Sequence, residues 1–370
     1  MLFKGTKNRT AQQIADEIES VGGYINAYTA RETTAYYVKF LKEDKNMAID
    51  ILSDMLLNSL IPEDELERER GVVLQELYQS RDTPDDIIFE HFQKTAFGDQ
   101  PLGTSILETE KIVEKMTADD LRSYLAKYYH SDNIIFGAVG NLSHDDLLDS
   151  ASKYLNSFNA EKTERYNTNF KYVGGSYSDI RDIEQVHAVV GFEGLSSKDN
   201  DYYTMAIMSS ILGGGMSSRL FQEIREKRGL VYSIYSFSNS YSNNGTFGIY
   251  AATTADKLKE LSDVLAVELL KIKEEISEKE FNRTKAQFKA GLLISAENNS
   301  TSCEQIVNQT AILGHPISHE ELLKKLENVT IDDVKRLATK VLSSKASIVT
   351  VGQCDCSNVL KSFKNNGFSC

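Results

Sequence analysis

The residues Thr117-Ala118-Asp119-Asp120-Leu121 recur as Thr330-Ile331-Asp332-Asp333-Val334, and this pair of segments decides the fold. Each segment is followed by a helical pattern and then by a short β-rich run that ends in glycine, at Gly140 and at Gly352. The offset is 213 at the threonines and 212 at the glycines. Such self-similarity at one spacing is typical of an internal duplication, and it predicts two copies of one α+β domain.

The two copies differ in length at their beginnings. We predict a first domain over 1–158, a linker over 159–175 and a second domain over 176–370. The second copy carries strands within 178–193 and an almost wholly apolar helix at 203–212, which have no counterpart ahead of residue 10. We therefore expect the first copy to be incomplete at its N-terminus.

Hydrophobic periodicity and end signals place the remaining elements. Strands rich in β-branched and aromatic residues are predicted at 24–29, 33–40, 134–139, 231–240, 246–253 and 347–351. Helices are predicted at 10–23, 44–58, 63–81, 83–96, 117–129, 144–157 and 256–275, with several more within 277–340. Met1-Leu2-Phe3-Lys4-Gly5-Thr6 resembles the last turn of a helix with its glycine stop.

Composition excludes several classes of protein. The chain has 370 residues, 41% hydrophobic and 26% charged, which suits two domains with cores of their own. A net charge of −13 argues against binding to nucleic acid or to an anionic membrane. Four cysteines in this length indicate reduced thiols, and no apolar run is long enough for a membrane span, so we expect a cytoplasmic protein.

Two glutamates on one predicted helix are candidates for chemistry. Glu69 and Glu76 lie seven residues apart, so two helical turns bring both carboxylates to nearly the same face. At the matching positions the second copy has Thr284 and Gly291, so the acidic pair belongs to one domain only. The residues alone favour a solvated charged face, and a metal-binding pair is the alternative.

Arg225 and Tyr232 are also seven residues apart, after the run Gly213-Gly214-Gly215. A guanidinium and a phenol can both stabilise charge that develops on a carbonyl oxygen. A surface arginine and a strand tyrosine are the simpler explanation. No Gly-Lys-Ser/Thr follows the glycines, which argues against a phosphate-binding loop.

The histidines and cysteines give weaker signals. His315 and His319 are the only spaced histidine pair, and a capping box starting at Ser318 separates them, so they need not share a helix face. Cys354 and Cys356 have no histidine nearby and are expected to be inert thiols. No Ser-His-Asp or Cys-His signature for nucleophilic catalysis stands out.

Taken together, these stretches resemble the insulinase/pitrilysin-like metallopeptidases of family M16, in particular their bacterial branch similar to mitochondrial processing peptidase. The resemblance covers Met1 to about residue 353. It implies a clamshell of two duplicated α/β-roll domains and a zinc-dependent endopeptidase that acts on extended peptides or unfolded segments. It also suggests a homodimer or a heterodimer with another M16 chain.

The resemblance also assigns roles to residues of this sequence. Glu76 matches the glutamate that ligates zinc, and Glu69 matches an accompanying glutamate that supports the site. The strand around Ile25-Asn26-Ala27 resembles the edge that holds substrate by strand addition. Arg225 and Tyr232 match the second-domain pair that reaches the substrate and the transition state.

The family's His-x-x-Glu-His motif does not occur in the 370 residues. It carries two zinc ligands and the general base, and in the family it ends where Met1 begins here. We therefore expect this polypeptide to be inactive as a peptidase, and we expect either that an upstream reading frame encodes the motif or that the gene is broken. The alternative is a non-catalytic, peptide-binding subunit of a two-component peptidase, and a solitary scaffold domain has no support in the sequence.

Overall fold

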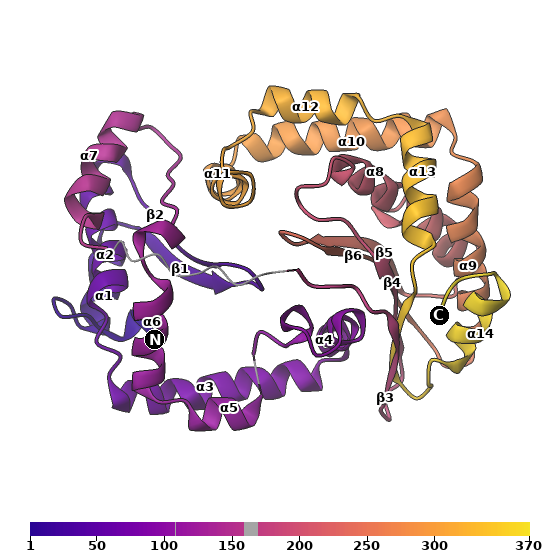
Figure 1. Ribbon diagram of the computed structural model, residues 1–370, viewed down its shortest axis with the longest axis horizontal. Coiled ribbons are helices and arrows are strands. Elements are labelled where there is room, and N and C mark those ends of the chain that lie inside the picture. Colours follow the sequence, from indigo (N-terminus) through magenta and orange to yellow (C-terminus); the bar gives the residue numbers. More distant parts are fainter. Residues whose placement is uncertain (108, 159–168) are drawn as a thin grey trace. The chain divides into compact units, whose positions relative to one another are not determined.

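The computed structural model describes residues 1–107, 109–158 and 169–370, which form two compact units (Figure 1). The first unit consists of Met1–Tyr78, Ile106–Asn167 and Ala296–Pro316. The second unit consists of Gln79–Ser105, Thr168–Ser295 and Ile317–Cys370. Each unit is therefore built from separate stretches of the chain.

The first unit packs helices against a two-stranded antiparallel hairpin. The hairpin pairs β1 (Tyr24–Thr29) with β2 (Thr34–Lys39), with Asn26 opposite Tyr37. One face of the hairpin packs on a core that includes Ile14, Ile18 and Met55. The other elements of this unit are η1 (Leu2–Lys4), α1 (Ala11–Ser20), η2 (Lys42–Asp44), α2 (Lys45–Asn58), most of α3 (Glu63–Asp82), α5 (Glu110–Lys115), α6 (Ala118–Tyr128), η4 (Ser131–Asn133), α7 (His144–Leu155) and α11 (Asn299–Leu313).

The second unit is organised around a five-stranded sheet with the order β3-β7-β4-β6-β5. β3 and β7 are parallel, and the other neighbours are antiparallel. The strands are β3 (Gly175–Ile180), β4 (Val186–Glu193), β5 (Ser233–Ser240), β6 (Gly245–Thr253) and β7 (Ser347–Gly352). The helices are α4 (Pro84–Phe97), η3 (Pro101–Gly103), α8 (Tyr202–Gly213), the π-helix η5 (Phe221–Glu226), α9 (Leu258–Glu274), α10 (Glu278–Ala296), α12 (His319–Glu327), α13 (Ile331–Leu342) and α14 (Ser357–Asn365).

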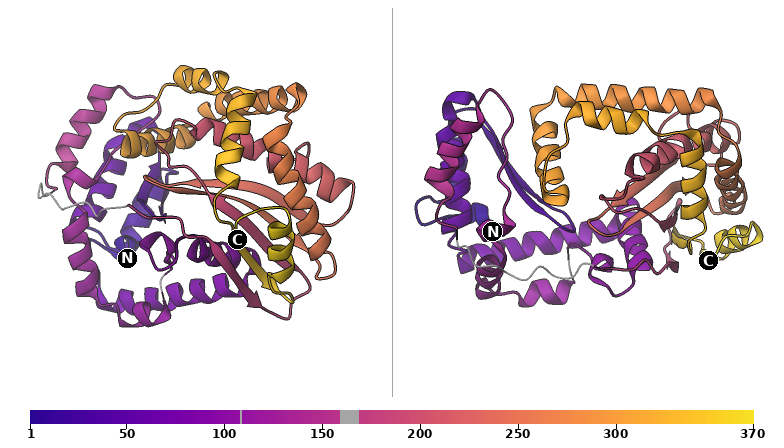
Figure 2. Two further views of the ribbon diagram at one scale, coloured as in Figure 1. Left: turned by 45° about the vertical axis from the view of Figure 1, so that its right-hand side comes forward. Right: turned by 45° about the horizontal axis from the view of Figure 1, so that its top comes forward.

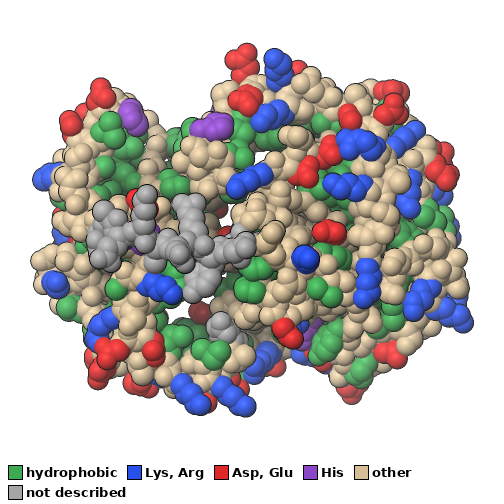
Figure 3. All heavy atoms as spheres, viewed as in Figure 1, with side chains coloured by type: hydrophobic (Ala, Val, Ile, Leu, Met, Phe, Trp, Pro, Cys, Tyr) green, Lys and Arg blue, Asp and Glu red, His purple; other side chains and the backbone are tan. Residues whose placement is uncertain are grey.

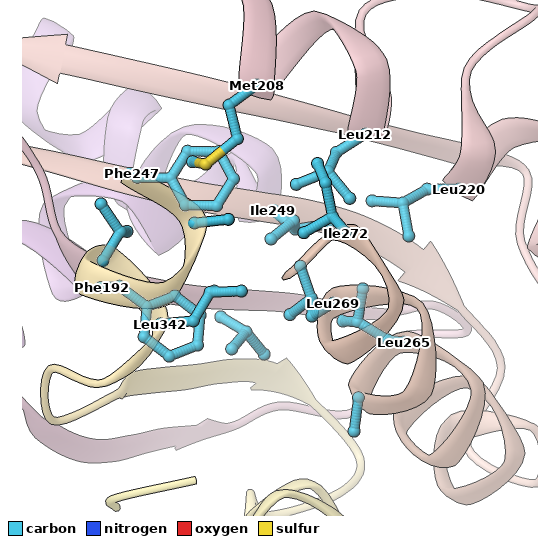
Figure 4. Packing of buried hydrophobic residues seen from close by; sticks show 14 of the residues in the cluster. Phe192, Met208, Leu212, Leu220, Phe247, Ile249, Leu265, Leu269, Ile272 and Leu342 are labelled. Atoms are coloured by element: carbon cyan, nitrogen blue, oxygen red, sulfur yellow. The ribbon is translucent and has the colours of Figure 1, made fainter. Parts of the chain in front are cut away.

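Both faces of this sheet are covered. On one face the main core joins the sheet to α8, α9 and α13, and Figure 4 shows side chains from these elements pointing toward one another. On the other face α4 packs over β7 and β4. The three central strands are consequently buried along nearly their whole length, which explains their continuous apolar runs.

The two segments that revealed the duplication have the same local structure. Thr117 and Thr330 each form a capping box, with Asp120 and Asp333 at the third helical position. Gly140 and Gly352, which end the matched runs, both have positive φ, at 152° and 140°. Because side chains other than hydrogen are strained there, both copies need glycine at this position.

The copies exchange one helix. α4 comes from the first half of the sequence but lies in the second unit, and α11 comes from the second half but lies in the first unit. Pro84 and Asn299 begin these helices at an offset of 215, the offset that also relates Glu63 to Glu278. The exchange is therefore reciprocal and follows the duplication.

The predicted helices and most strands are confirmed, but the strand at 134–139 is wrong. Its counterpart β7 lies between β3 and β4, and among the described residues the first copy has no strands equivalent to those two. In the described part of the chain, 134–139 therefore has no ladder partner and is covered by α11, whose Val307 lies against Gly137. The short α5 and η5 and the C-terminal α14 were not anticipated.

Two further predictions concern the domain boundary and the membrane. Much of the predicted linker, 159–168, lies outside the described residues, and the boundary stays a prediction. None of the helices among the described residues is long and apolar enough to cross a membrane. On the face seen in Figure 3, acidic and basic side chains are interspersed over α12 and α13, where Lys325 pairs with Glu321 and Arg336 with Asp201.

Candidate functional site

The acidic pair lies on α3, as predicted from the sequence. Glu69 is half-buried, and its Oε1 lies 2.7 Å from Nζ of Lys4. Glu76 is exposed, while Leu77 beside it is buried and Val73 is half-buried. The carboxylate of Glu76 therefore remains in water and bears no cost of burial.

Lys4 is a partner of Glu69 that the sequence did not reveal. It closes the 3₁₀-helix η1, and Gly5 follows with φ of 121°. The predicted helix end is therefore a single 3₁₀ turn followed by glycine. Because Leu2 of this turn is buried in the core of the first unit, the turn holds the Lys4 ammonium against α3.

The segment after Lys4 is fixed by a buried carboxylate. Asp54 is 4% exposed and accepts hydrogen bonds from Thr6 Oγ1 at 2.5 Å, Asn8 Nδ2 at 2.6 Å and Asn58 Nδ2 at 2.9 Å. Arg9 also lies 3.1 Å from Asp54. Burial by itself raises the pKa of Asp54, but these hydrogen bonds outweigh it and hold the pKa below its usual value. The charged carboxylate thus positions Thr6, Asn8 and Arg9. These residues follow Lys4, which pairs with Glu69.

These residues do not by themselves fit a zinc ion. A catalytic zinc normally has three protein ligands and an open position for water. Among the described residues, no group of three or more His, Cys, Asp or Glu side chains is arranged to hold a metal. Glu69 is moreover engaged with a cation, Lys4, rather than with a second ligand. The donor set on α3 is at most part of a metal site.

Arg225 and Tyr232 lie next to each other in the second unit. The Arg225 guanidinium stands 4.6 Å from the ring centre of Phe221 and 5.9 Å from that of Tyr232. Arg225 belongs to η5, and π-helical turns are frequent at functional sites. In the described part of the chain Arg225 forms no ion pair, and Tyr232 is 78% exposed. Both polar groups are therefore available to a ligand.

Two local features fix this pair. Gly229, with φ of 59°, donates its N–H to the Arg225 carbonyl and ends the turn. The buried Val231 and the hydrogen bond from Tyr232 N–H to the Ala252 carbonyl then anchor the next residues beside β6. The family resemblance predicted that the two side chains act together, and the structure places them next to each other; their shared role stays a prediction.

The predicted substrate edge, Ile25-Asn26-Ala27, forms the middle of β1. Among the described residues β1 pairs only with β2, so its other edge is open. The Ala27 N–H donates to Oδ1 of Asn26 at 2.8 Å. Because N–H groups of alternate residues point to the same side of an antiparallel strand, Ile25 and Ala27 present their backbone groups together.

Comparison with known proteins supports the assignment of the fold. Residues 1–110 match the family "Insulinase (Peptidase family M16)", and residues 115–288 match "Peptidase M16 inactive domain". An "Uncharacterized zinc protease" of Rickettsia felis is 38% identical over 356 residues, which cover 96% of this chain and 86% of that protein. The similarity thus spans both copies of the duplicated domain.

Two proteins of lower sequence identity are also similar to this chain over both copies of the domain. The "Probable mitochondrial-processing peptidase subunit beta" of Arabidopsis thaliana is 32% identical over 359 residues, or 93% of this chain and 67% of that protein. The crystal structure of a protease from Helicobacter pylori aligns with a TM-score of 0.88 and 20% identity, covering 95% of this chain and 86% of that one. At this identity the structural likeness concerns the fold alone.

Proposed function

Because the chain belongs to the M16 (insulinase) family of peptidases, whose relatives are named zinc proteases, we propose that it binds extended peptides along the open edge of β1. We further propose that α3 carries one part of a zinc site that the described residues do not complete. Glu76 is assigned as the carboxylate ligand and Glu69 as its supporting residue. The observation that carries this assignment is the pair of carboxylates seven residues apart on α3.

Strand addition is the binding mode that the hairpin favours. An extended peptide pairs with the outward N–H and C=O groups of an edge strand, so it is recognised without a fixed sequence. Ile25 and Ala27 supply those groups. The Ala27 N–H donates to Asn26 Oδ1, and the carbonyl of a bound peptide would replace this oxygen as the acceptor. Arg225 and Tyr232 of the second unit are proposed as donors to a peptide carbonyl, since a guanidinium and a phenol both donate hydrogen bonds to carbonyl oxygens.

The test measures binding, zinc and hydrolysis on the same preparation. We expect the 370-residue chain to bind a fluorescent extended peptide, to retain far less than one zinc per chain, and to leave a quenched fluorescent peptide uncleaved. A chain carrying His-x-x-Glu-His ahead of Met1 is expected to gain zinc and hydrolysis that EDTA abolishes, and to lose the zinc on Glu76→Gln. EDTA-sensitive hydrolysis by the 370 residues alone would refute the incomplete site, and lack of peptide binding would refute the role of β1.

Proline at residue 27 tests the edge directly. Ala27→Pro removes one outward N–H while keeping an extended backbone, which edge strands tolerate. We expect the peptide dissociation constant to rise about 2- to 10-fold, as for the loss of one hydrogen bond. Ala27→Gly keeps the N–H and should retain the affinity. Equal affinities of the two variants, with circular dichroism unchanged, would show that the peptide binds elsewhere.

A second candidate function is that of a non-catalytic, peptide-binding subunit beside another M16 chain. The ion pair between Glu69 and Lys4 favours it, because this carboxylate is satisfied without a metal. In this case the 370-residue chain should raise the rate of a partner chain that carries the zinc motif, and Arg225→Ala should remove the increase. A rate that does not depend on the added chain would exclude this role.

A further inference from the structure

Segment 219–228 carries four basic side chains, and they differ in what holds them. Three of them form ion pairs with carboxylates, at 2.5, 2.6 and 2.9 Å: Arg219 with Glu280, and Lys227 and Arg228 with Glu223. Arg225 is the exception, because no carboxylate among the described residues pairs with it. Its guanidinium lies instead 4.6 Å from the ring centre of Phe221.

The acidic residues of η5 are placed so that they do not serve Arg225. The hydrogen bond from Lys227, with a further one from Arg228, holds the pKa of Glu223 below its usual value, and this carboxylate is occupied by those two cations. Glu226 is exposed and directly follows Arg225, and consecutive residues of a helix point to different sides. Neither acidic residue of η5 is therefore the partner of the Arg225 guanidinium.

The helix itself brings Phe221 to Arg225. They are the first and fifth residues of η5, and residues four apart on a helix are neighbours on its surface. Leu220 and Ile224, which precede them, are both 0% exposed and anchor the helix in the main core. η5 packs on α9 and β5 within the second unit, and both views in Figure 2 show α9 beside the sheet of that unit. The ring and the guanidinium are thus carried on an element that is fixed from below.

The ring of Phe221 differs from its buried neighbours in what it contacts. It is half-buried, and in the described part of the chain it is not one of the hydrophobic side chains packed on the main core. A ring contacts the flat face of a guanidinium, whereas the N–H donors lie along the edge of that group. A carboxylate would take two of these donors and balance the charge, but a ring does neither. Phe221 therefore holds Arg225 without using the groups that bind an acceptor.

We propose that Phe221 is the positioning residue of Arg225, and that its ring takes the place of a carboxylate so that the guanidinium stays a charged donor to the carbonyl oxygen of a bound peptide. This inference rests on the proposed function, in which Arg225 donates to that oxygen. Hydrogen bonds from a charged donor are stronger than those between neutral groups, so a guanidinium free of a carboxylate is the better donor. Tyr232, whose ring centre lies 5.9 Å from the guanidinium, is a second and more distant aromatic contact.

The first test compares a ring with an aliphatic side chain at residue 221. We expect Phe221→Leu to raise the dissociation constant of a labelled extended peptide about 2- to 5-fold, the size of a partly exposed contact between a cation and a ring. Phe221→Tyr keeps the ring and should restore the native affinity. The measurement is fluorescence anisotropy with the 370-residue chain, with circular dichroism to show that each variant is folded. Equal losses in the two variants would overturn the proposal.

The second test asks whether the ring acts through Arg225. Arg225→Ala should raise the dissociation constant about 10-fold or more, as for the loss of a hydrogen bond from a charged donor. In the Arg225→Ala background Phe221→Leu should have no further effect, because the group that the ring positions is gone. A loss of the same size in both backgrounds would mean that Phe221 supports only the fold, and would overturn the positioning role.

The third test replaces the ring by a carboxylate. Phe221→Glu places an acidic group four residues before Arg225, a spacing at which ion pairs form on a helix. We expect the affinity to fall toward that of Arg225→Ala, because the guanidinium is then held but occupied. Glu226→Gln is the matched control on η5 and should leave the affinity unchanged. Native affinity in Phe221→Glu, or a loss in Glu226→Gln equal to that in Phe221→Leu, would overturn the proposal.

The outcomes separate this inference from the proposed function. A weaker Arg225→Ala together with an unchanged Phe221→Leu would overturn the positioning role and leave Arg225 as a donor to the peptide. Native affinity in Arg225→Ala would refute the role of Arg225 in the proposed function, and the inference with it. Failure of the native chain to bind any extended peptide would overturn the proposed function as a whole.

Discussion

Replacement of Phe92 by alanine is expected to lower the free energy of unfolding by about 3–5 kcal/mol, the usual cost of removing a buried phenylalanine ring. Phe92 is 1% exposed and lies in the cluster that joins α4 to Val189 and Val349 of the sheet. A Cβ built at Gly191 would lie 2.4 Å from the Phe92 ring. The glycine in β4 therefore leaves the space that the ring fills. The surrounding backbone is fitted to this ring and cannot collapse fully into the cavity left behind.

The measurement is chemical denaturation followed by circular dichroism and tyrosine fluorescence, since the chain has no tryptophan. Lys94→Ala is the control on the same helix, because Lys94 is 54% exposed and pairs only at the surface with Asp99. Phe92→Leu should recover part of the lost stability. If Phe92→Ala and Lys94→Ala denature at the same midpoint, α4 does not hold the sheet in solution.

That prediction depends on the helix exchange, which the sequence could not supply. The repeated threonine and aspartate residues and the matched glycines predicted the duplication because they are local signals, and the structure gives both segments a capping box. Which sheet a helix covers is decided by packing between distant residues. The apolar pattern of α4 does not indicate that Phe92 packs against Gly191, a residue about a hundred positions later.

The strand at 134–139 shows a different limit. Its composition is that of a buried strand, and its counterpart β7 is one. A strand also needs neighbours to supply hydrogen bonds, and those neighbours depend on other parts of the chain. Composition favoured a strand at 134–139, but it could not show whether the described residues would provide a partner.

The sequence predicted some features of the candidate site and missed others, because only some of them depend on residues close together in the chain. Helical spacing placed Glu69 and Glu76 on one helix, whereas Tyr232 lies outside the π-helix of Arg225, so helical spacing does not account for their contact. The ion pair of Glu69 with Lys4 joins residues 65 positions apart and leaves no trace in local sequence.

Replacement of Asp54 by asparagine is the second large effect, with an expected loss of about 3 kcal/mol at pH 7. The four partners of Asp54 are all donors, and an amide offers one of its two ends as a further donor. The Asn variant therefore leaves buried donors unpaired around Thr6 and Arg9. Asp50→Asn is the control, because Asp50 also binds Arg9 but is 40% exposed, and its loss should stay below about 1 kcal/mol.

The pH dependence tests whether charge is the cause. Asp54 has a lowered pKa in the folded protein, so its contribution is complete above the pKa of the unfolded chain, near 4, and is lost as the pH falls through the folded value. The stability difference between the native protein and Asp54→Asn should hold constant from pH 7 to about pH 5 and shrink below pH 4. A difference that persists unchanged at low pH would mean that shape, and not ionisation, is what Asp54 supplies.

We also predict which part of the structure loses stability in Asp54→Asn. Segment 5–7 is tied to 58–60 by the Leu60 N–H to the Gly5 carbonyl and by the Lys7 N–H to the Asn58 carbonyl. Hydrogen exchange at these amides should rise in Asp54→Asn, because local opening costs less once the carboxylate is gone. The same opening should release Lys4 from Glu69, and Lys4→Ala in the Asp54→Asn background should then cost less than in the native protein. Additive losses would show that Asp54 stabilises the first unit without positioning the residues beside Glu69.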